Sequence, residues 1–420
     1  MQTAPHAITA PVTVARLLSK GRIRAVYQPV VRLDDRSVVG YEALMRGPEG
    51  SPLESARALM EAAEAEGLTE ELGRAAVAAA IDGASEAGLG ATHTVFLNIR
   101  AKTLTTRLRD DAVIERAGNR LRLVWEFVER TLLEDPAGLL AAVESYRERY
   151  WGVALDHVGT DNAAALALLP FVRPDVIKLD LGLIQRKSTR DIGRVVAAVA
   201  EHVELNGGEI VAMGVETEAH LERALTLGAT LGQGWLFGRP DVLPTEVPRP
   251  TGTVPLIVAP TAQQPSTPFD LVAAGRSDVR IATKSTLLGL SKFIEGQSDL
   301  SDHRYILLST FQHVRNFTIR TRARYARHAA ACALTGIFGV GVPTRPGGAT
   351  VGVPLSSDDP LAREWTVICI GPHYSAALIS RDLGDRGDDS RRRFEFVLTH
   401  DRSAVVAAAR SLMARIARQA

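Results

Sequence analysis

Apolar residues in the first half of the chain fall into short runs that alternate with segments of helical periodicity. The segments between the runs, such as residues 135–150 and 191–205, repeat apolar positions every three to four residues. Eight strands over residues 20–245, with helices between them, predict a (β/α)8 TIM-like barrel of the α/β class, with a doubly wound open sheet as the alternative. The predicted strands lie at residues 24–33, 37–46, 92–100, 121–128, 151–158, 175–180, 208–215 and 231–237.

Polar residues recur near the carboxyl ends of these predicted strands and favour the barrel. Barrel enzymes gather their catalytic groups at that rim. One such residue is explained as a loop charge or a helix cap, but a recurrence inside apolar segments is not explained as solvated surface. Even spacing places Glu42 with Arg46, and Lys178 with Asp180, on one strand face. The recurring residues are Glu42, Asn98, Glu126, Asp156, Lys178, Glu216 and Gln233.

A proline-rich stretch divides the chain. Eight of the 21 prolines lie between Pro240 and Pro268, in a segment with almost no charge. Because proline lacks a backbone donor, we expect an extended, semi-rigid linker at 246–267. It separates an N-terminal extension (1–19) and the barrel (20–245) from a smaller α/β domain (268–420). Strands are predicted there at 305–312, 336–342, 365–371, 374–382 and 394–401, and helices at 283–296 and 403–417.

Composition limits the cellular context and the partners. The 420 residues are 46% hydrophobic and 23% charged, as in globular proteins that fold without disulfides. Cys332 and Cys369 lie in apolar runs and are expected to be buried thiols. The net charge of +1 predicts no bulk attraction for nucleic acid. No apolar run approaches the roughly 20 residues of a membrane span, and the start lacks a signal-peptide pattern, so a cytoplasmic location is expected.

The ordered motifs of the first half resemble the EAL family, which is named for a motif present here as Glu42-Ala43-Leu44. The resemblance implies a barrel that hydrolyses one phosphodiester of cyclic di-GMP to linear pGpG with two Mg²⁺ or Mn²⁺ ions. Such hard cations take oxygen ligands, and paired metals activate water and stabilise charge on the attacking and leaving oxygens. The matching segments are YQPVV, YEALMR, FLNIR, WEFVE, ALDHVGTD, VIKLD, GVETEAHLERALTLGA and GQGWLFGRP.

The same resemblance implies roles for individual residues. Lys178 would lie near the attacking water or the phosphate, Glu216 matches a catalytic glutamate, and Glu129 would anchor the loop after strand five. Taken alone, Gln28, Glu129 and Gln233 also fit an edge-strand cap, a neighbouring ion pair and a turn. The ligands implied for the first metal are Glu42, Asn98, Glu126 and Asp156. The substrate contacts implied are Gln28, Arg46, Asp180 and Gln233, the arginine presenting a planar fork to phosphate.

Two positions depart from the family pattern. His157 replaces the second aspartate of a pair that holds the second metal, and Met213 replaces an acidic residue beside that metal. A neutral imidazole is a poor Mg²⁺ ligand, and a thioether transfers no proton. Losing positioned proton transfer costs about 10²–10⁴-fold in rate. His157 is either a replacement ligand or a loop histidine without a ligand role.

These departures favour a degenerate phosphodiesterase that still binds cyclic di-GMP and acts as a nucleotide-responsive module under sensory control. One alternative is an active metal-dependent phosphodiesterase with His157 as a ligand. Another is a barrel kept only for protein–protein contact. The resemblance also implies a homodimer formed through the loop at residues 159–164.

The second domain resembles the DICT family of sensory domains, through the segments ILLSTFQHVRNFT, RTRARYARHAA, GPHYSAAL, ISRDLGD and RRFEFVLTHD. The sensory ligand or protein partner stays open. The arginine-rich stretch at 315–327 is a solvated helix face or a nucleic-acid patch, and no aromatic stacking platform accompanies it. His313, His373 and Tyr374 either line a small-molecule pocket or lie partly buried at strand ends.

Overall fold

The structure, a computed structural model, describes most of the chain as two compact units. Unit 1 comprises Met1–Phe127, Trp151–Ala154 and Glu209–Leu256, and unit 2 comprises Val128–Tyr150, Leu155–Gly208 and Ile257–Ala420. The described residues are 12–99, 120–128, 136–159, 166–185, 190–244, 246–250, 252–256, 267–299, 305–371, 374–385 and 388–417.

The first eight strands form a closed barrel in chain order, so the predicted barrel is confirmed and the open-sheet alternative is wrong. Strand β1 is antiparallel to both β2 and β8, whereas β3 is parallel to β2 and to β4. Only residues 33–37 join β1 to β2, too few for the crossover of a dozen or more residues that a parallel pair needs. The strands are β1 (Arg24–Arg32), β2 (Val38–Arg46), β3 (Thr94–Asn98), β4 (Arg122–Val128), β5 (Gly152–Val158), β6 (Val176–Leu179), β7 (Glu209–Ala212) and β8 (Leu231–Gly232).

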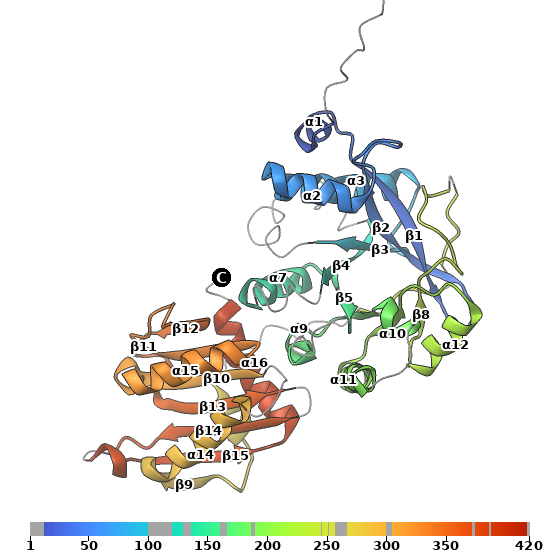
Figure 1. Cartoon of the computed structure of the whole chain (residues 1–420). Helices are drawn as coiled ribbons and strands as arrows, with labels where there is room; N and C mark the ends of the chain where they lie inside the picture. Colours follow the sequence, from blue (N-terminus) through green and yellow to red (C-terminus); the bar gives the residue numbers. More distant parts are fainter. Residues whose placement is uncertain are drawn as a thin grey trace, which may run out of the picture. The chain divides into compact units, whose positions relative to one another are not determined.

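Helices α1 (Val14–Ser19), α2 (Ala56–Glu66) and α3 (Thr69–Glu86) pack together in unit 1, shown in blue in Figure 1. Val14 and Leu59 are fully buried in their shared core. The backbone N–H groups of Val14 and Ala15 each donate to the carboxylate of Glu66 at 2.9 Å. Helix α1, in the region expected to be an extension, is therefore packed against the barrel's first helices. Helix α12 (Glu218–Thr226) also belongs to this unit.

The part of unit 2 that carries β6 contains α7 (Pro136–Glu148), α9 (Leu169–Val172), α10 (Leu181–Gln185) and α11 (Arg190–Asn206). A buried ion pair connects two segments of this region. Arg147 Nη1 lies 2.6 Å from the fully buried carboxylate of Asp175. Arg147 thereby links the end of α7 to the residue that precedes β6.

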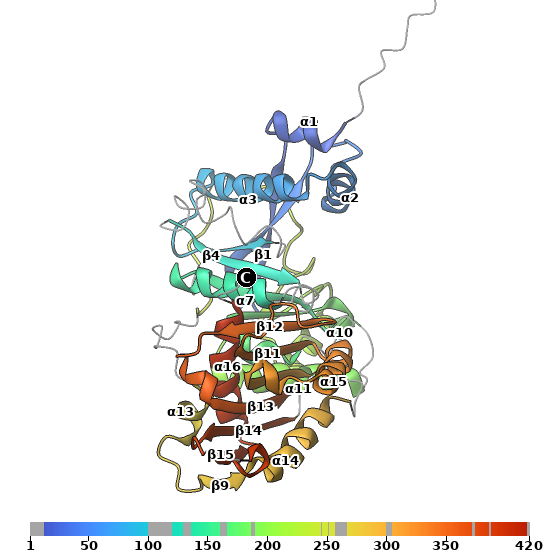
Figure 2. The same cartoon turned by 90° about the vertical axis from the view of Figure 1, so that its left-hand side faces the viewer.

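The second domain contains a seven-stranded sheet in the order β12-β11-β10-β13-β14-β15-β9 (Figure 2). Helices α14 (Lys284–Gly296) and α15 (Ile319–Ala331) cover one face, and α13 (Pro268–Ala273) and α16 (Arg402–Ala417) cover the other. The predicted α/β fold is confirmed. The strands are β9 (Arg280–Thr283), β10 (Ile306–His313), β11 (Leu334–Val340), β12 (Thr350–Leu355), β13 (Glu364–Ile370), β14 (Ser375–Asp382) and β15 (Arg393–Thr399).

The two edge strands of this sheet escape sequence-based prediction. Strand β9 is largely exposed and therefore lacks an apolar run, and β12 contains Gly352 and Pro354, residues that punctuate strand patterns. Cys332 and Cys369 are buried thiols in the core of this domain, as predicted. Across the described residues, none of the helices combines the length and apolarity that crossing a membrane requires.

Candidate functional site

Glu42 is the centre of a hydrogen-bonded cluster in unit 1. It lies buried on β2, and Nδ2 of Asn98, at the end of β3, donates to its Oε1 at 2.7 Å. Nε2 of Gln233, just after β8, donates to its Oε2 at 2.7 Å and also to Oε1 of Gln28 at 3.2 Å. Gln28 pairs directly with Glu42 across the β1–β2 ladder. The fold thus brings together four predicted site residues from four parts of the barrel.

Two further predicted residues lie on β4 and β2. Glu126, on β4, is buried and pairs in register with Asn98. Arg46 ends β2, and its Nη1 donates to the backbone carbonyl of Met45 at 2.8 Å. Burial lowers the pKa of Arg46 from its ordinary value, and the neighbouring Arg24 lowers it further. The cluster therefore contains two buried carboxylates and three side-chain amides, with a guanidinium at the end of β2.

This donor set fits a hard divalent cation. Carboxylate and amide oxygens are the ligands that Mg²⁺ and Mn²⁺ prefer. Oε1 of Gln233 is buried, and no described residue donates a hydrogen bond to it. The described residues contain no group of three or more His, Cys, Asp and Glu side chains able to hold a metal, so a site here depends on the Asn98 amide. Asn98 would have to rotate so that Oδ1, not Nδ2, faces Glu42.

In unit 2, His157 holds the carboxylate of Asp156 at the end of β5. The backbone N–H of His157 donates to Oδ1 at 2.9 Å, and Nδ1 lies 2.8 Å from Oδ2. Nζ of the fully buried Lys178 lies 3.9 Å from Oδ1. Burial opposes ionisation of Asp156, but Lys178 and His157 keep its pKa below the ordinary value. The hydrogen bond to Asp156 in turn raises the pKa of His157.

Asp180 follows β6 and stabilises the start of α10. Its backbone N–H donates to the carbonyl of Val158 at 3.1 Å, which ties β6 to the end of β5. Its side chain accepts from the backbone N–H of Gly182 at 2.7 Å. The structure thus shows a capping role for Asp180, and its substrate contact stays a prediction.

The remaining predicted residues do not join either cluster. Met213 lies partly buried after β7, and Glu216 is exposed, with its backbone N–H donating to Nδ1 of His220 at 3.3 Å. Glu129 and the predicted dimer loop from residue 160 onward lie outside the described residues, as does His373. The catalytic role of Glu216 and the anchoring role of Glu129 stay predictions.

Family models match both halves of the chain. A model described as the EAL domain matches residues 12–240, more than half of the chain. The chain belongs to the EAL domain family. A second model, described as the sensory domain in diguanylate cyclases and two-component systems, or DICT, matches residues 270–383.

Relatives of this EAL protein include named cyclic di-GMP phosphodiesterases. The probable cyclic di-GMP phosphodiesterase PdeB of Escherichia coli is 27% identical over 227 residues, covering 52% of this chain and 42% of PdeB. The cyclic di-GMP phosphodiesterase RocR of Pseudomonas aeruginosa is 27% identical over 241 residues, covering 54% of this chain and 59% of RocR. The chain thus spans about two to three fifths of the length of these relatives.

Solved EAL structures are also similar to the chain. The FimX EAL domain from Pseudomonas aeruginosa, bound to c-di-GMP, is 18% identical with a TM-score of 0.48. The similarity covers 56% of this chain and 96% of that one.

In the DICT domain, the structure favours the alternative in which His313 and Tyr374 lie partly buried at strand ends. Strands β10 and β14 run in the same direction, because each is antiparallel to β13. His313 ends β10 and Tyr374 precedes β14, so the two residues lie at opposite ends of the sheet. Nδ1 of His313 instead accepts from the backbone N–H of Arg315 at 3.2 Å. Burial raises the pKa of Tyr374 to about 12.

The arginine-rich stretch of the EAL–DICT chain forms much of α15. Nε of Arg324 lies 2.7 Å from the buried carboxylate of Glu295, and the Arg322 guanidinium lies 5.8 Å from the ring centre of Phe317. Arg320 and Arg327 are exposed. This arrangement supports the interpretation of the stretch as a solvated helix face, on which Arg324 forms an ion pair.

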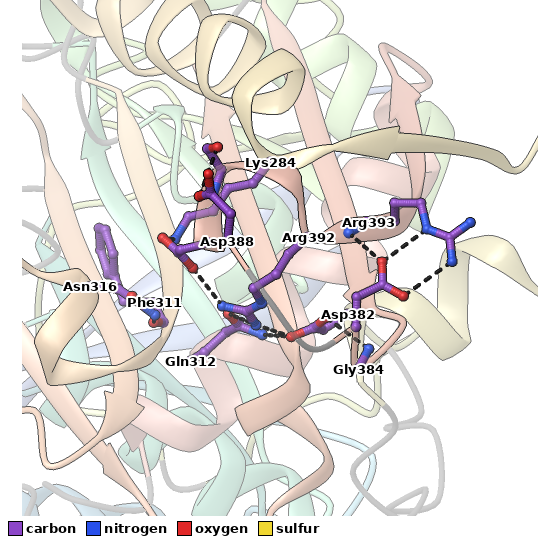
Figure 3. Close-up of polar contacts among 12 residues, drawn as sticks. Lys284, Phe311, Gln312, Asn316, Asp382, Gly384, Asp388, Arg392 and Arg393 are labelled. Atoms are coloured by element: carbon purple, nitrogen blue, oxygen red, sulfur yellow. Dashed lines mark hydrogen bonds and ion pairs between the residues drawn. The ribbon is translucent and has the colours of Figure 1, made fainter.

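A polar cluster that no sequence pattern predicts lies at one end of the DICT sheet (Figure 3). Arg392 donates to Asp382, to Asp389 at 3.0 Å and to Oε1 of Gln312 at 3.3 Å. Gln312 has a φ of 57° and lies where the β10–β11 register shifts, a strained position for a residue other than glycine. Gln312 and Asp382 are 70 residues apart in the chain, so no local pattern signals the cluster.

Proposed function

We propose that this EAL–DICT protein binds cyclic di-GMP at the carboxyl ends of its barrel strands, hydrolyses it slowly, and acts as a nucleotide-responsive module controlled by its DICT domain. The relatives PdeB and RocR, named as cyclic di-GMP phosphodiesterases, support the choice of ligand. The observation that carries slow hydrolysis is the hold of His157 on both carboxylate oxygens of Asp156.

The chain's own residues divide into an intact and an altered set. Glu42, Asn98 and Glu126, all in unit 1, are the residues proposed to hold one Mg²⁺ or Mn²⁺ ion. When bound, such an ion stabilises negative charge on the phosphate oxygens. Arg46 and Lys178 add positive charge for the two phosphates of the ligand.

The altered set weakens the chemistry at the proposed second metal position. His157 supplies a hydrogen-bond donor where a second carboxylate would add negative charge, so it lowers the attraction for another cation. Met213 has no group that accepts or donates a proton. Binding therefore depends on residues that are present, whereas fast hydrolysis depends on two positions that have changed.

An active phosphodiesterase is the second candidate, and the Lys178–Asp156 contact favours it. Lys178 is buried within 3.9 Å of Asp156, as a residue positioned beside a reacting phosphate would be. The two candidates differ in turnover, because both predict binding.

Restoring the altered residues separates the two candidates. The full chain and the double variant H157D/M213E are incubated with cyclic di-GMP in Mg²⁺ and in Mn²⁺, pGpG is followed by chromatography, and binding is measured by calorimetry. We expect the native chain to bind with little product, and the double variant to hydrolyse at least about 100-fold faster, because it regains proton transfer and a carboxylate ligand.

The control H313D adds the same carboxylate in the DICT domain and should leave the rate unchanged. Rapid turnover by the native chain would establish an active enzyme. If the native chain neither binds nor hydrolyses the dinucleotide, the proposal is wrong and the barrel serves protein contacts.

A further inference from the structure

A cavity of about 220 Å³ lies within unit 2, between α16 and the helices α9 and α11. Helix α16 lines it with Ser403, Val406 and Arg410, whose spacing of three and four residues places them on one face of the helix. Leu169 and Leu205 form part of the opposite wall. One wall therefore presents a guanidinium, and apolar side chains lie on both sides.

Arg410 presents positive charge that no described carboxylate neutralises. Its Nε, at 3.0 Å, and its Nη2 both donate to the backbone carbonyl of Pro170, and no described residue accepts from Nη1. No described Asp or Glu lies within ion-pair distance of Arg410. Burial, together with the charge of the nearby Arg173, lowers the pKa of Arg410 to about 10. Arg410 is partly buried, and a cation removed from water without a counter-ion costs free energy, so an anion beside it is stabilising.

The other charged groups near the cavity do not neutralise the positive charge of Arg410. Arg402 is neutralised, because its Nε lies 2.8 Å from Glu201. His202 is buried, and burial lowers its pKa to about 4, so it is uncharged at pH 7. Beyond the cavity lining, Arg147 is paired with Asp175, and the charge of Asp175 also acts on Arg173. Arg410 is thus the lining residue that supplies net positive charge.

We propose that this cavity binds a small organic acid, with its carboxylate at Arg410 and a short apolar body against Leu169, Leu205 and Val406. The volume is smaller than the roughly 300–1,000 Å³ of pockets for drug-sized ligands and equals the liquid volume of roughly seven water molecules. The apolar walls favour a compound with a hydrocarbon portion over inorganic phosphate. This site is separate from nucleotide binding by the barrel and does not depend on the proposed function.

The test titrates the full chain with butyrate by calorimetry at constant ionic strength. Butyramide, a neutral compound of the same shape, and inorganic phosphate, an anion without an apolar body, are the matched probes. We expect butyrate to bind one site per chain, and both other probes to bind at least tenfold more weakly. Failure of butyrate to bind at 10 mM, or equal binding of butyramide, would overturn the proposal.

Two variants locate the site. R410M removes the charge and should weaken butyrate binding at least tenfold, whereas R320M removes an exposed charge on α15 and should leave it unchanged. S403F fills the cavity from an exposed position, so it blocks binding without disturbing the core and decides the question if R410M does not fold. Butyrate binding that persists unchanged in S403F would place the acid elsewhere and contradict the proposal.

Discussion

His157 determines how much negative charge the end of β5 presents. Its side chain and backbone both hold Asp156, so the carboxylate is oriented and partly neutralised by its own neighbour. His157 adopts a left-handed φ of 56°, a conformation in which Asp, Asn and His are enriched among residues other than glycine. An aspartate at this position therefore suits the backbone, which makes H157D a test of charge and not of strain.

Arg392 offers a second test at the residue scale, because it links three segments of the DICT domain. R392M should lower the free energy of unfolding by about 2–3 kcal/mol, since it leaves the mostly buried Asp382 carboxylate without its main partner. R391M, one residue away and exposed, should change it by less than about 0.5 kcal/mol. Urea unfolding of the full chain measures both, and equal effects would mean that the cluster adds no stability.

At the scale of elements, Glu364 joins the start of β13 to the start of α13. Thr267 caps this helix by accepting from the backbone N–H of Asp270, and Oε2 of Glu364 accepts from that of Phe269 at 3.1 Å. The pKa of Glu364 is raised to about 7, because burial and the charge of Asp270 outweigh the opposing effects of Thr267, Phe269 and Arg381. The first helix after the linker thus depends on a carboxyl group that titrates near neutrality.

This contact predicts how stability changes with pH. The folded state binds the Glu364 proton more tightly than the unfolded state, so the DICT domain should lose stability as pH rises from about 4.5 to about 7, by roughly 1–3 kcal/mol. E364Q keeps an acceptor for Phe269 and should remove this dependence, whereas E395Q, at a partly exposed glutamate, should retain it. Scanning calorimetry of the full chain between pH 5 and 8 measures the effect. A similar pH dependence in E364Q would rule out Glu364 as its source.

At the scale of the whole molecule, α16 belongs to two packing layers of unit 2. The helix contacts α13, β13 and β14 of the DICT domain, and it also contacts α7 and α9 (Figure 1). Arg410 reaches the carbonyl of Pro170 across 240 residues of sequence. Pro170 belongs to the segment that leads into β6, the strand of Lys178, so α16 offers a direct physical route between the sensory domain and that strand.

The Arg402–Glu201 ion pair tests whether this packing holds in solution. R402E places two carboxylates together and should raise hydrogen-exchange rates of α16 backbone amides about fivefold relative to those of α15, a modest effect because both side chains are partly exposed. The charge-swapped variant E201R/R402E should restore native exchange. Unchanged exchange in R402E would show that the ion pair does not hold α16 in place.

Apolar runs and ordered motifs along the chain are enough to predict the barrel, the position of its strands and the family. Buried strands consist of apolar runs, and helices repeat apolar positions every three to four residues, so both can be predicted from local sequence. Local sequence also marks Glu42, Asn98, Glu126 and Gln233 as candidate site residues, because each lies in or next to an apolar run inside a recognisable motif.

The tertiary structure alone decided which side chains meet. The hold of His157 on Asp156, the Arg392 cluster and the charge of Arg410 all depend on burial and on three-dimensional distance. Arg402 and Arg410 look alike in the sequence of α16, yet one has a carboxylate partner and the other has none within the described residues. Local periodicity predicts which face of a helix is buried, but it does not specify which residues, hundreds of positions away, lie against that face.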